Sequence, residues 1–274
     1  VVRSQGGLVR LGAEVDEIVI ENGVSKGVRL TTGEMLHADV TVSNADAGHT
    51  YTRLLRNHQR RRWTDGKLKS RRWSMGLFVW YFGTKGTAGK WRDVGHHTIM
   101  NGPRFRGLLK DIFRKGVLAD DMSLYIHRPS VTDPGVAPEG DDTFYVLSPV
   151  PHLGHPNPVN WDAMEETYRA RVAENLQSVI PGFEEHISTQ ATFTPKTFRD
   201  RYLSPLGAGF SIEPRILQSA WFRPHNVSEE AEGLYLVGAG THPGAGLPGV
   251  ISSAEVLGQL VPDAIPIAEK VAAE

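Results

Sequence analysis

Alternating apolar and polar positions predict short strands near the start of the chain. Residues 15–20 form an apolar strand, and a turn follows at Asn22-Gly23 because this pair tolerates positive φ. Residues 26–43 supply three more short strands, the last of them rich in β-branched side chains. We therefore expect a β meander over residues 14–43.

The centre of the chain mixes both periodicities. A long, aromatic-rich apolar run at residues 73–82 predicts a buried strand, and residues 162–180 place apolar side chains on one helical face. Pro181-Gly182 ends that helix. The same reasoning predicts a basic helical segment at 46–70, a helix at 104–115, strands at 122–127 and 143–150, and short strands and turns at 187–220.

The last part of the chain has the pattern of a strand, a glycine-rich loop and an amphipathic helix. These elements are expected at residues 234–237, 238–249 and 250–261, with the helix beginning near Pro248, since proline is tolerated in a first turn. An α/β piece thus stands at each end, with a mixed α+β insert between. We expect the ends, 1–47 and 226–274, to form one domain and 48–225 another.

Composition narrows the class of protein. The 274 residues are 40% hydrophobic and 22% charged, as is usual for a folded protein. The net charge of -1 creates no field that would recruit nucleic acid, so we expect no nucleic-acid partner. The lack of cysteine excludes disulfides, thiolate zinc sites and cysteine nucleophiles. No apolar run reaches the roughly 18 residues that a membrane span needs, and the first residues do not resemble a signal peptide.

One local basic run departs from this balance. It comprises Arg60, Arg61, Arg62, Lys67, Lys69, Arg71 and Arg72. The simpler interpretation is a solvated helix face or loop. The alternative is contact with lipid headgroups, because clustered cations near a surface bind anionic lipid.

The glycine-rich loop is the sharpest candidate for ligand binding. Glycines let the backbone approach a ligand closely, and the start of the following helix offers unpaired N–H groups with partial positive charge. Gly238–Val250 would suit a pyrophosphate or the electron-rich edge of a reduced flavin. The spacing is not that of the dinucleotide fingerprint, and a flexible glycine-rich connection is the alternative.

A second candidate lies where the meander ends, at Val42–Asp46. Small and polar residues there could pass the backbone beside a cofactor, which makes Asn44 a candidate contact. The alternative is a plain strand-to-helix turn in which Asn44 or Asp46 caps the helix.

The histidines do not predict a metal site. His96-His97 and His152-x-x-His155 lack a carboxylate at regular spacing on rigid elements, and His127 is expected to be a core or cavity residue. The sequence contains no Gly-x-Ser-x-Gly elbow, which argues against a serine hydrolase. The many aromatic residues of the insert form either its core or an apolar tunnel for a long ligand.

Three ordered runs carry a resemblance to a known family. They are Ser123–Gly140, Tyr145–Gly154, and Ala220–Asn226 followed by the loop at 238–250. Together they resemble bacterial phytoene desaturases over nearly the whole chain. This family is similar to amine oxidases in fold, which implies an α/β, Rossmann-type FAD-binding domain assembled from discontinuous segments, with an inserted α+β substrate domain.

The resemblance also implies a function and its site. It implies FAD-dependent desaturation of phytoene and partly desaturated carotenes towards lycopene, by hydride transfer to flavin N5, with a quinone or oxygen as electron acceptor. It implies peripheral attachment to a membrane, on the cytoplasmic side. The Val15 backbone would meet the adenine, and the loop would lie along the ribitol and isoalloxazine. The expected cofactor contacts are Val15, Asn44, Gly238, Ala239, Gly240, Thr241, Leu247, Pro248, Gly249 and Val250.

The family's N-terminal dinucleotide-binding motif has no counterpart in this sequence. Because the chain opens at Val1 in what resembles the end of a helix, we expect a C-terminal portion that alone binds flavin poorly and is inactive. No catalytic residue is assigned. The alternatives are a related carotenoid desaturase, ketolase or isomerase, and a non-catalytic module that binds carotenoid or lipid.

Overall fold

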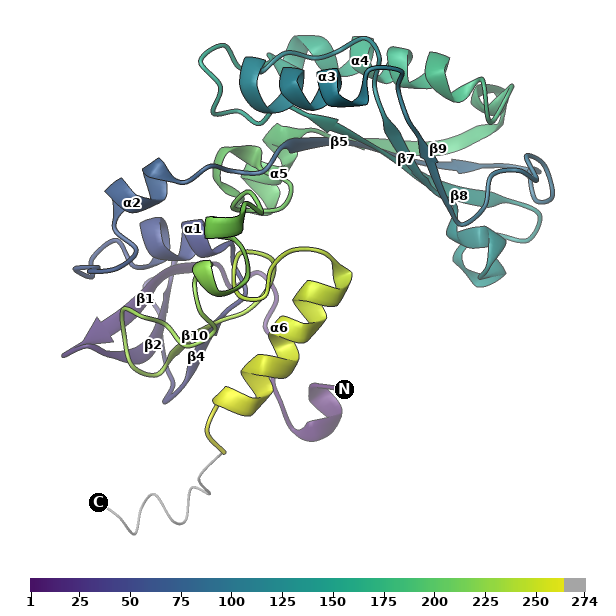
Figure 1. Cartoon of the computed structure of the whole chain (residues 1–274). Helices are drawn as coiled ribbons and strands as arrows, with labels where there is room; N and C mark the ends of the chain where they lie inside the picture. The colour runs from purple at the N-terminus through teal and green to yellow at the C-terminus, as the bar shows by residue number, and fades with distance from the viewer. Residues whose placement is uncertain (264–274) are drawn as a thin grey trace. The chain divides into compact units, whose positions relative to one another are not determined.

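The computed structural model describes residues 1–263 as two compact units (Figure 1). The first unit combines Val1–Arg72 with the chain from Ser211 onward, and the second is Trp73–Phe210. These limits differ from the expected 1–47, 48–225 and 226–274. The reason is packing, because Tyr51, Trp63 and Leu68 share one buried cluster with the strand residues Leu234 and Leu236.

The first unit holds two small sheets. Strands β1, β2 and β3 form the predicted antiparallel meander, in that order. The fourth predicted strand does not continue it, because β4 pairs in parallel with β10, with Val42 opposite Tyr235. The bounds are β1 Val15–Glu21, β2 Val24–Leu30, β3 Met35–His37, β4 Thr41–Ser43 and β10 Leu234–Leu236.

The helical segment predicted at residues 46–70 is helical only in part. The segment divides into α1 (Ala47–His49), a π-helical turn (Thr50–Leu54) and α2 (Asp65–Ser70). Between them the backbone N–H groups of Arg61 and Arg62 donate to the Glu230 carboxylate at 2.7 and 2.9 Å. These amides therefore bind a side chain in place of helical carbonyls. The unit also contains α6 (Leu247–Leu260) and the 3-10 turns Arg3–Gln5, Ile216–Gln218 and Ala220–Phe222.

Side chains of the basic run are largely occupied within the first unit. Arg60 pairs with Asp65 at 2.7 Å and Arg62 with Glu229 at 2.6 Å. Lys67 lies 4.1 Å from the Trp63 ring centroid, within cation–π range. These contacts favour a structural role for the run, while the lipid contact stays a prediction.

The second unit is a five-stranded antiparallel sheet in the order β6-β7-β8-β5-β9. Its strands are β5 Gly76–Thr84, β6 His97–Met100, β7 Leu124–His127, β8 Asp142–Val150 and β9 Ile187–Phe193. Helices α3 and α4 lie on one face of the sheet (Figure 1). The helical elements are α3 Phe105–Lys110 with a π-helical turn at Asp111–Lys115, α4 Trp161–Leu176, α5 Pro195–Arg201, and 3-10 turns at Pro129–Val131, Pro134–Val136, Phe183–His186 and Pro205–Gly207.

Strand alternation gives this sheet two different faces. Phe78 and Trp80 are buried in a cluster with Tyr168 and Val172 of α4. The next residue along, Tyr81, is 40% exposed and lies on the other face. The predicted strand at 73–82 thus supplies both faces. Among the described residues, no helix is both long and apolar enough to cross a membrane.

Candidate functional site

The predicted cofactor loop begins where two parallel strands end side by side. Ser43 of β4 lies opposite Leu236 of β10, so the segments after both strands leave from the same edge. In α/β proteins, ligands bind at the carboxyl ends of parallel strands. The structure therefore brings Asn44, from the first part of the chain, next to Gly238, from the last.

Glycine is required in this loop by close backbone approach. A Cβ on Gly238 would lie 2.7 Å from Asn44 Oδ1, and Gly238 has a φ of +109°. A Cβ on Gly240 would lie 2.9 Å from the Ala47 backbone nitrogen. Both separations are closer than real Cβ contacts. At Gly238 the neighbour is the end of the Asn44 side chain, so it is the positive φ that favours glycine there. At Gly240 the neighbour is backbone, so a larger residue would have to move the start of α1.

Buried hydroxyls fix the shape of the loop. Thr241 Oγ1 donates to the Gly238 carbonyl at 2.9 Å and lies 3.0 Å from Ser253 Oγ of α6. Ser253 Oγ also accepts the Gly238 N–H at 3.1 Å and an N–H of Asn226 Nδ2 at 2.9 Å. Loop, strand end and helix are therefore joined by satisfied polar contacts, which preorganise a backbone site.

A buried arginine supports the same loop. Arg223 donates to the carbonyls of Ala239 and Ile212 at 2.8 and 2.7 Å. Burial lowers the pKa of Arg223, opposed by the charge of Asp46. Burial also raises the pKa of Asp46, whose carboxylate caps α1 by accepting the Gly48 N–H at 2.7 Å. Both charged groups are used to hold the loop and the helix start.

Helix α6 begins close to the predicted position, three residues before Val250. Leu247 is 78% exposed, and Pro248 is exposed beside it in the first turn. A Cβ on Gly249 would lie 2.5 Å from the Gly244 carbonyl, so the loop folds tightly against this turn. The predicted apolar side of the helix is not its buried side, since Ile251 is 58% exposed while Ser253 is buried. The buried side instead satisfies the loop's polar groups.

The predicted contacts thus divide into two sets. Asn44 and the loop residues Gly238–Thr241 gather at one edge, with Leu247–Val250 following in the same loop and helix start. Val15 lies apart from them in the antiparallel meander, where it pairs with Leu30. Sequence reasoning gave no site role to Arg223, Asn226 or Ser253. Arg223 and Asn226 lie in the Ala220–Asn226 run that carries the family resemblance, which is the signal that could have marked them.

The second unit carries an aromatic face opposite its helix-covered core. Tyr81 and Tyr145 are cross-strand partners with ring centroids 5.8 Å apart. Tyr145 lies 5.7 Å from Tyr125, and Tyr81 lies 5.3 Å from Phe193. Tyr202 lies next to Phe193 and extends the row. We call the surface formed by these side chains the aromatic face; its members are Tyr81, Tyr125, Tyr145, Phe193 and Tyr202. It is a row of rings across four of the strands.

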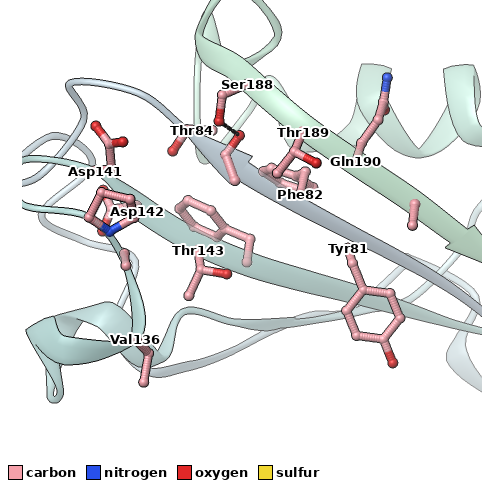
Figure 2. A pocket seen from close by; sticks show the side chains of 15 residues that line it. Tyr81, Phe82, Thr84, Val136, Asp141, Asp142, Thr143, Ser188, Thr189 and Gln190 are labelled. Carbon is pink, nitrogen blue, oxygen red and sulfur yellow. Dashed lines mark hydrogen bonds between the residues drawn. The ribbon is translucent and has the colours of Figure 1, made fainter.

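A pocket of about 380 Å³ lies at one end of this sheet (Figure 2). Phe82, Thr143 and Val136 line it, together with Asp142. The Asp142 carboxylate is already bound in a bidentate pair by Arg128, at 3.1 and 2.8 Å. The pocket therefore offers no free buried acid for catalysis at that position.

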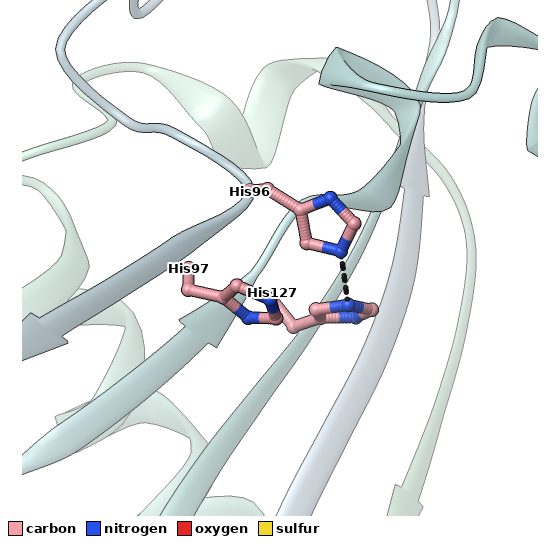
Figure 3. Close-up of side chains that lie close together, drawn as sticks. All are labelled: His96, His97 and His127. Atoms are coloured by element: carbon pink, nitrogen blue, oxygen red, sulfur yellow. Dashed lines mark hydrogen bonds between the residues drawn. The ribbon is translucent and has the colours of Figure 1, made fainter.

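Three histidines lie close together beside the aromatic face, where β6 pairs with β7. His97 of β6 lies opposite His127 of β7, and His96 reaches across so that its Nε2 is 2.8 Å from His127 Nε2 (Figure 3). Burial and the neighbouring histidines lower the pKa of His127. No pattern in the sequence joins the three, because His127 lies thirty residues beyond His97, in a separate strand.

The fold defines a class of mixed α/β proteins that includes oxidoreductases. It matches an oxidoreductase from Methanosarcina mazei with a TM-score of 0.60 and 19% identity, over 94% of this chain and 51% of that one. A protein from Pyrococcus furiosus matches with a TM-score of 0.50 and 19% identity, over 92% and 48%. At this identity the likeness concerns the fold alone. No family model matches the chain.

Sequence comparison is far more specific. The chain is 70% identical to the neurosporene-forming phytoene desaturase of Cereibacter sphaeroides, and 65% identical to that of Rhodobacter capsulatus, in each case over 96% of this chain and 51% of the relative. It is 45% identical to the lycopene-forming phytoene desaturase of Pseudescherichia vulneris, over 93% and 51%. The chain spans about half the length of these curated relatives.

The chain is therefore a homologue of bacterial phytoene desaturases over nearly its whole length, which confirms the resemblance found in the sequence. These homologues are oxidoreductases that act on CH–CH groups. The match agrees with the predicted C-terminal portion of such an enzyme.

Proposed function

We propose that this chain forms part of a phytoene desaturase, which removes hydrogens from phytoene in carotenoid biosynthesis. The observation that carries the proposal is the 70% identity over 96% of the chain with a phytoene desaturase. At that identity, the two proteins share their fold over the matched residues.

The end product we propose is neurosporene. Two relatives named as neurosporene-forming are 70% and 65% identical to this chain, whereas three named as lycopene-forming are 43–45% identical. This modifies the expectation of lycopene, which remains the alternative outcome in the experiment below.

FAD is the proposed cofactor, and the residues at the parallel-strand edge fit it. Gly238, Gly240 and Gly249 let the loop pack closely against Asn44, Ala47 and Gly244, which leaves backbone rather than bulky side chains to shape this edge, and Thr241 and Ser253 hold that shape. When bound, FAD would supply a two-electron acceptor that takes a hydride from the polyene at N5. The N–H groups of the first turn of α6 would favour negative charge beside them.

The aromatic face is the proposed substrate surface. Phytoene is a long hydrocarbon, and sites for such ligands are mostly apolar with few polar groups. Tyr81, Tyr145 and Phe193 present a continuous row of rings on the face that α3 and α4 leave open. The role of these side chains is to bind and align the chain and to exclude water from it.

We further propose that the enzyme docks peripherally on the cytoplasmic side of a membrane and that a quinone or oxygen reoxidises it. The support is chemical: phytoene dissolves in lipid, and repeated desaturation needs a renewable electron acceptor.

The test is product analysis with the full-length enzyme. Its gene would be expressed in a host that makes phytoene and no later carotene, and pigments would be separated by chromatography and identified by absorption spectra. We expect neurosporene as the main product. Lycopene would correct the end point alone, whereas unchanged phytoene with soluble enzyme present would refute the desaturase assignment.

A further inference from the structure

We propose that His96, His97 and His127 form a binding site for a divalent transition metal ion of the zinc type. Each histidine offers one ring nitrogen, and the three nitrogens all lie within 4.8 Å of one another (Figure 3). The site belongs to the second unit and is independent of the proposed cofactor edge.

The strand register brings these side chains together. His97 and His127 are cross-strand partners in the β6–β7 pair, so their side chains lie on the same face. His96 precedes β6 and turns its Nε2 to within 2.8 Å of His127 Nε2. Three nitrogens bound to zinc at about 2.0–2.1 Å stand roughly 3.3 Å apart. The nitrogens, all within 4.8 Å of one another, therefore stand close to the separations that zinc requires.

Outer contacts already orient two of the rings. His96 Nδ1 lies in hydrogen-bond range of Thr132 Oγ1, and His97 Nδ1 is 2.6 Å from the Tyr125 hydroxyl. Metal-binding histidines commonly use their second nitrogen in this way, which fixes the ring and its tautomer. A bound ion would replace the present hydrogen bond between His96 Nε2 and His127 Nε2.

The ligand set selects the class of metal. Three imidazoles without a carboxylate or thiolate suit zinc, copper or nickel and disfavour magnesium and calcium, which prefer oxygen. His97 is exposed, so a fourth position would be open to water. Such an ion would clamp β6 to β7 and to the turn at Thr132, at the edge of the aromatic face.

Zinc titration of the untagged protein tests the site. After treatment with a chelator, Zn²⁺ binding would be measured by calorimetry and by competition with a chromophoric chelator, with circular dichroism as the check on folding. We expect one ion per chain. His97→Gln, at an exposed position, should weaken binding at least about tenfold, and Tyr125→Phe by about tenfold through loss of the outer contact.

Two matched variants locate the ion. His37→Gln removes an exposed histidine from β3, and His152→Gln alters the other close histidine pair, His152–His155. Neither should change Zn²⁺ affinity. The proposal is overturned if folded wild-type protein binds no zinc, if His97→Gln binds as the wild type does, or if a control variant loses the ion. Because the readout is binding, its failure leaves the desaturase assignment untouched.

Discussion

The two units build their candidate surfaces from different parts of the chain. In the first unit, backbone atoms form the surface, because Gly240 and Gly249 approach neighbouring backbone more closely than any side chain allows. In the second unit, side chains form it, as Tyr81 and Tyr145 present rings on a regular sheet. One surface depends on the absence of side chains and the other on their area.

This difference predicts different responses to substitution. A site made of close backbone contacts fails completely when one Cβ is added, since the segment must move. An apolar surface made of several rings loses affinity gradually, because each ring contributes its own buried area. The predictions below test this contrast, from the largest expected effect to the smallest.

Gly249→Leu in the full-length enzyme should abolish flavin retention. Its Cβ would lie 2.5 Å from the Gly244 carbonyl, so the loop and the first turn of α6 would have to separate. The measurement is the flavin-to-protein absorbance ratio of the purified enzyme.

Gly258→Leu is the matched control in the same helix. A Cβ on Gly258 meets nothing within 4 Å, so its flavin content should equal that of the wild type. Normal flavin in Gly249→Leu would remove this loop from the cofactor site. Equal loss in both variants would point to a general defect of the helix.

Asp142→Asn should lower the free energy of unfolding by about 3–5 kcal/mol, since it leaves Arg128 buried without its charge partner. Burial alone would raise the pKa of Asp142. Hydrogen bonds from Arg128, Ser130 and Thr87 outweigh this effect, so the net shift of the pKa is downward. The carboxylate thus contributes stability above its unfolded pKa of about 4. That contribution is lost as the pH falls through the lowered folded value.

Denaturant unfolding between neutral and acidic pH measures both effects. The variant should lose the part of the acid sensitivity that Asp142 carries. Glu34→Gln is the control, because it removes an exposed pair with Arg10 and should leave the unfolding midpoint unchanged. A midpoint for Asp142→Asn equal to that of the wild type would show that the pair is not structurally important.

Sequence reasoning was most successful where the local pattern decides the structure. The meander strands and the turn at Asn22-Gly23 follow from alternation and turn chemistry, and α6 starts close to Pro248 as its first-turn preference predicts. The helical segment predicted at 46–70 is interrupted because Glu230, far along the chain, accepts hydrogen bonds from the backbone amides of Arg61 and Arg62. Periodicity contains no information about such a partner.

The candidate sites show the same limit. Glycine content marked the loop, and the structure adds its supports, Arg223 and Ser253, which come from separate segments. The histidine cluster was missed because β6 was not predicted, so the register of His97 with His127 was unknown. A strand assignment at residues 97–100 would have placed both on one face.

Tyr81→Ser in the full-length enzyme should raise the KM for phytoene about tenfold, which corresponds to about 1.4 kcal/mol, and should leave kcat nearly unchanged. Tyr81 is 40% exposed on the aromatic face, so its ring would bury area against a bound hydrocarbon. Loss of contacts that are equal in ground and transition states appears in KM alone. The assay follows product formation from phytoene in lipid vesicles.

Leu109→Ser is the control for lost apolar surface. Leu109 is 37% exposed on α3, on the helix-covered side of the same sheet, so its exposure matches that of Tyr81 while its position does not. Its KM should stay at the wild-type value. If both variants raise KM alike, the effect reflects general apolar surface such as membrane docking. If neither variant raises KM, the aromatic face is not the polyene surface. The backbone site at the glycine-rich loop would then be the one candidate surface of the two that remains.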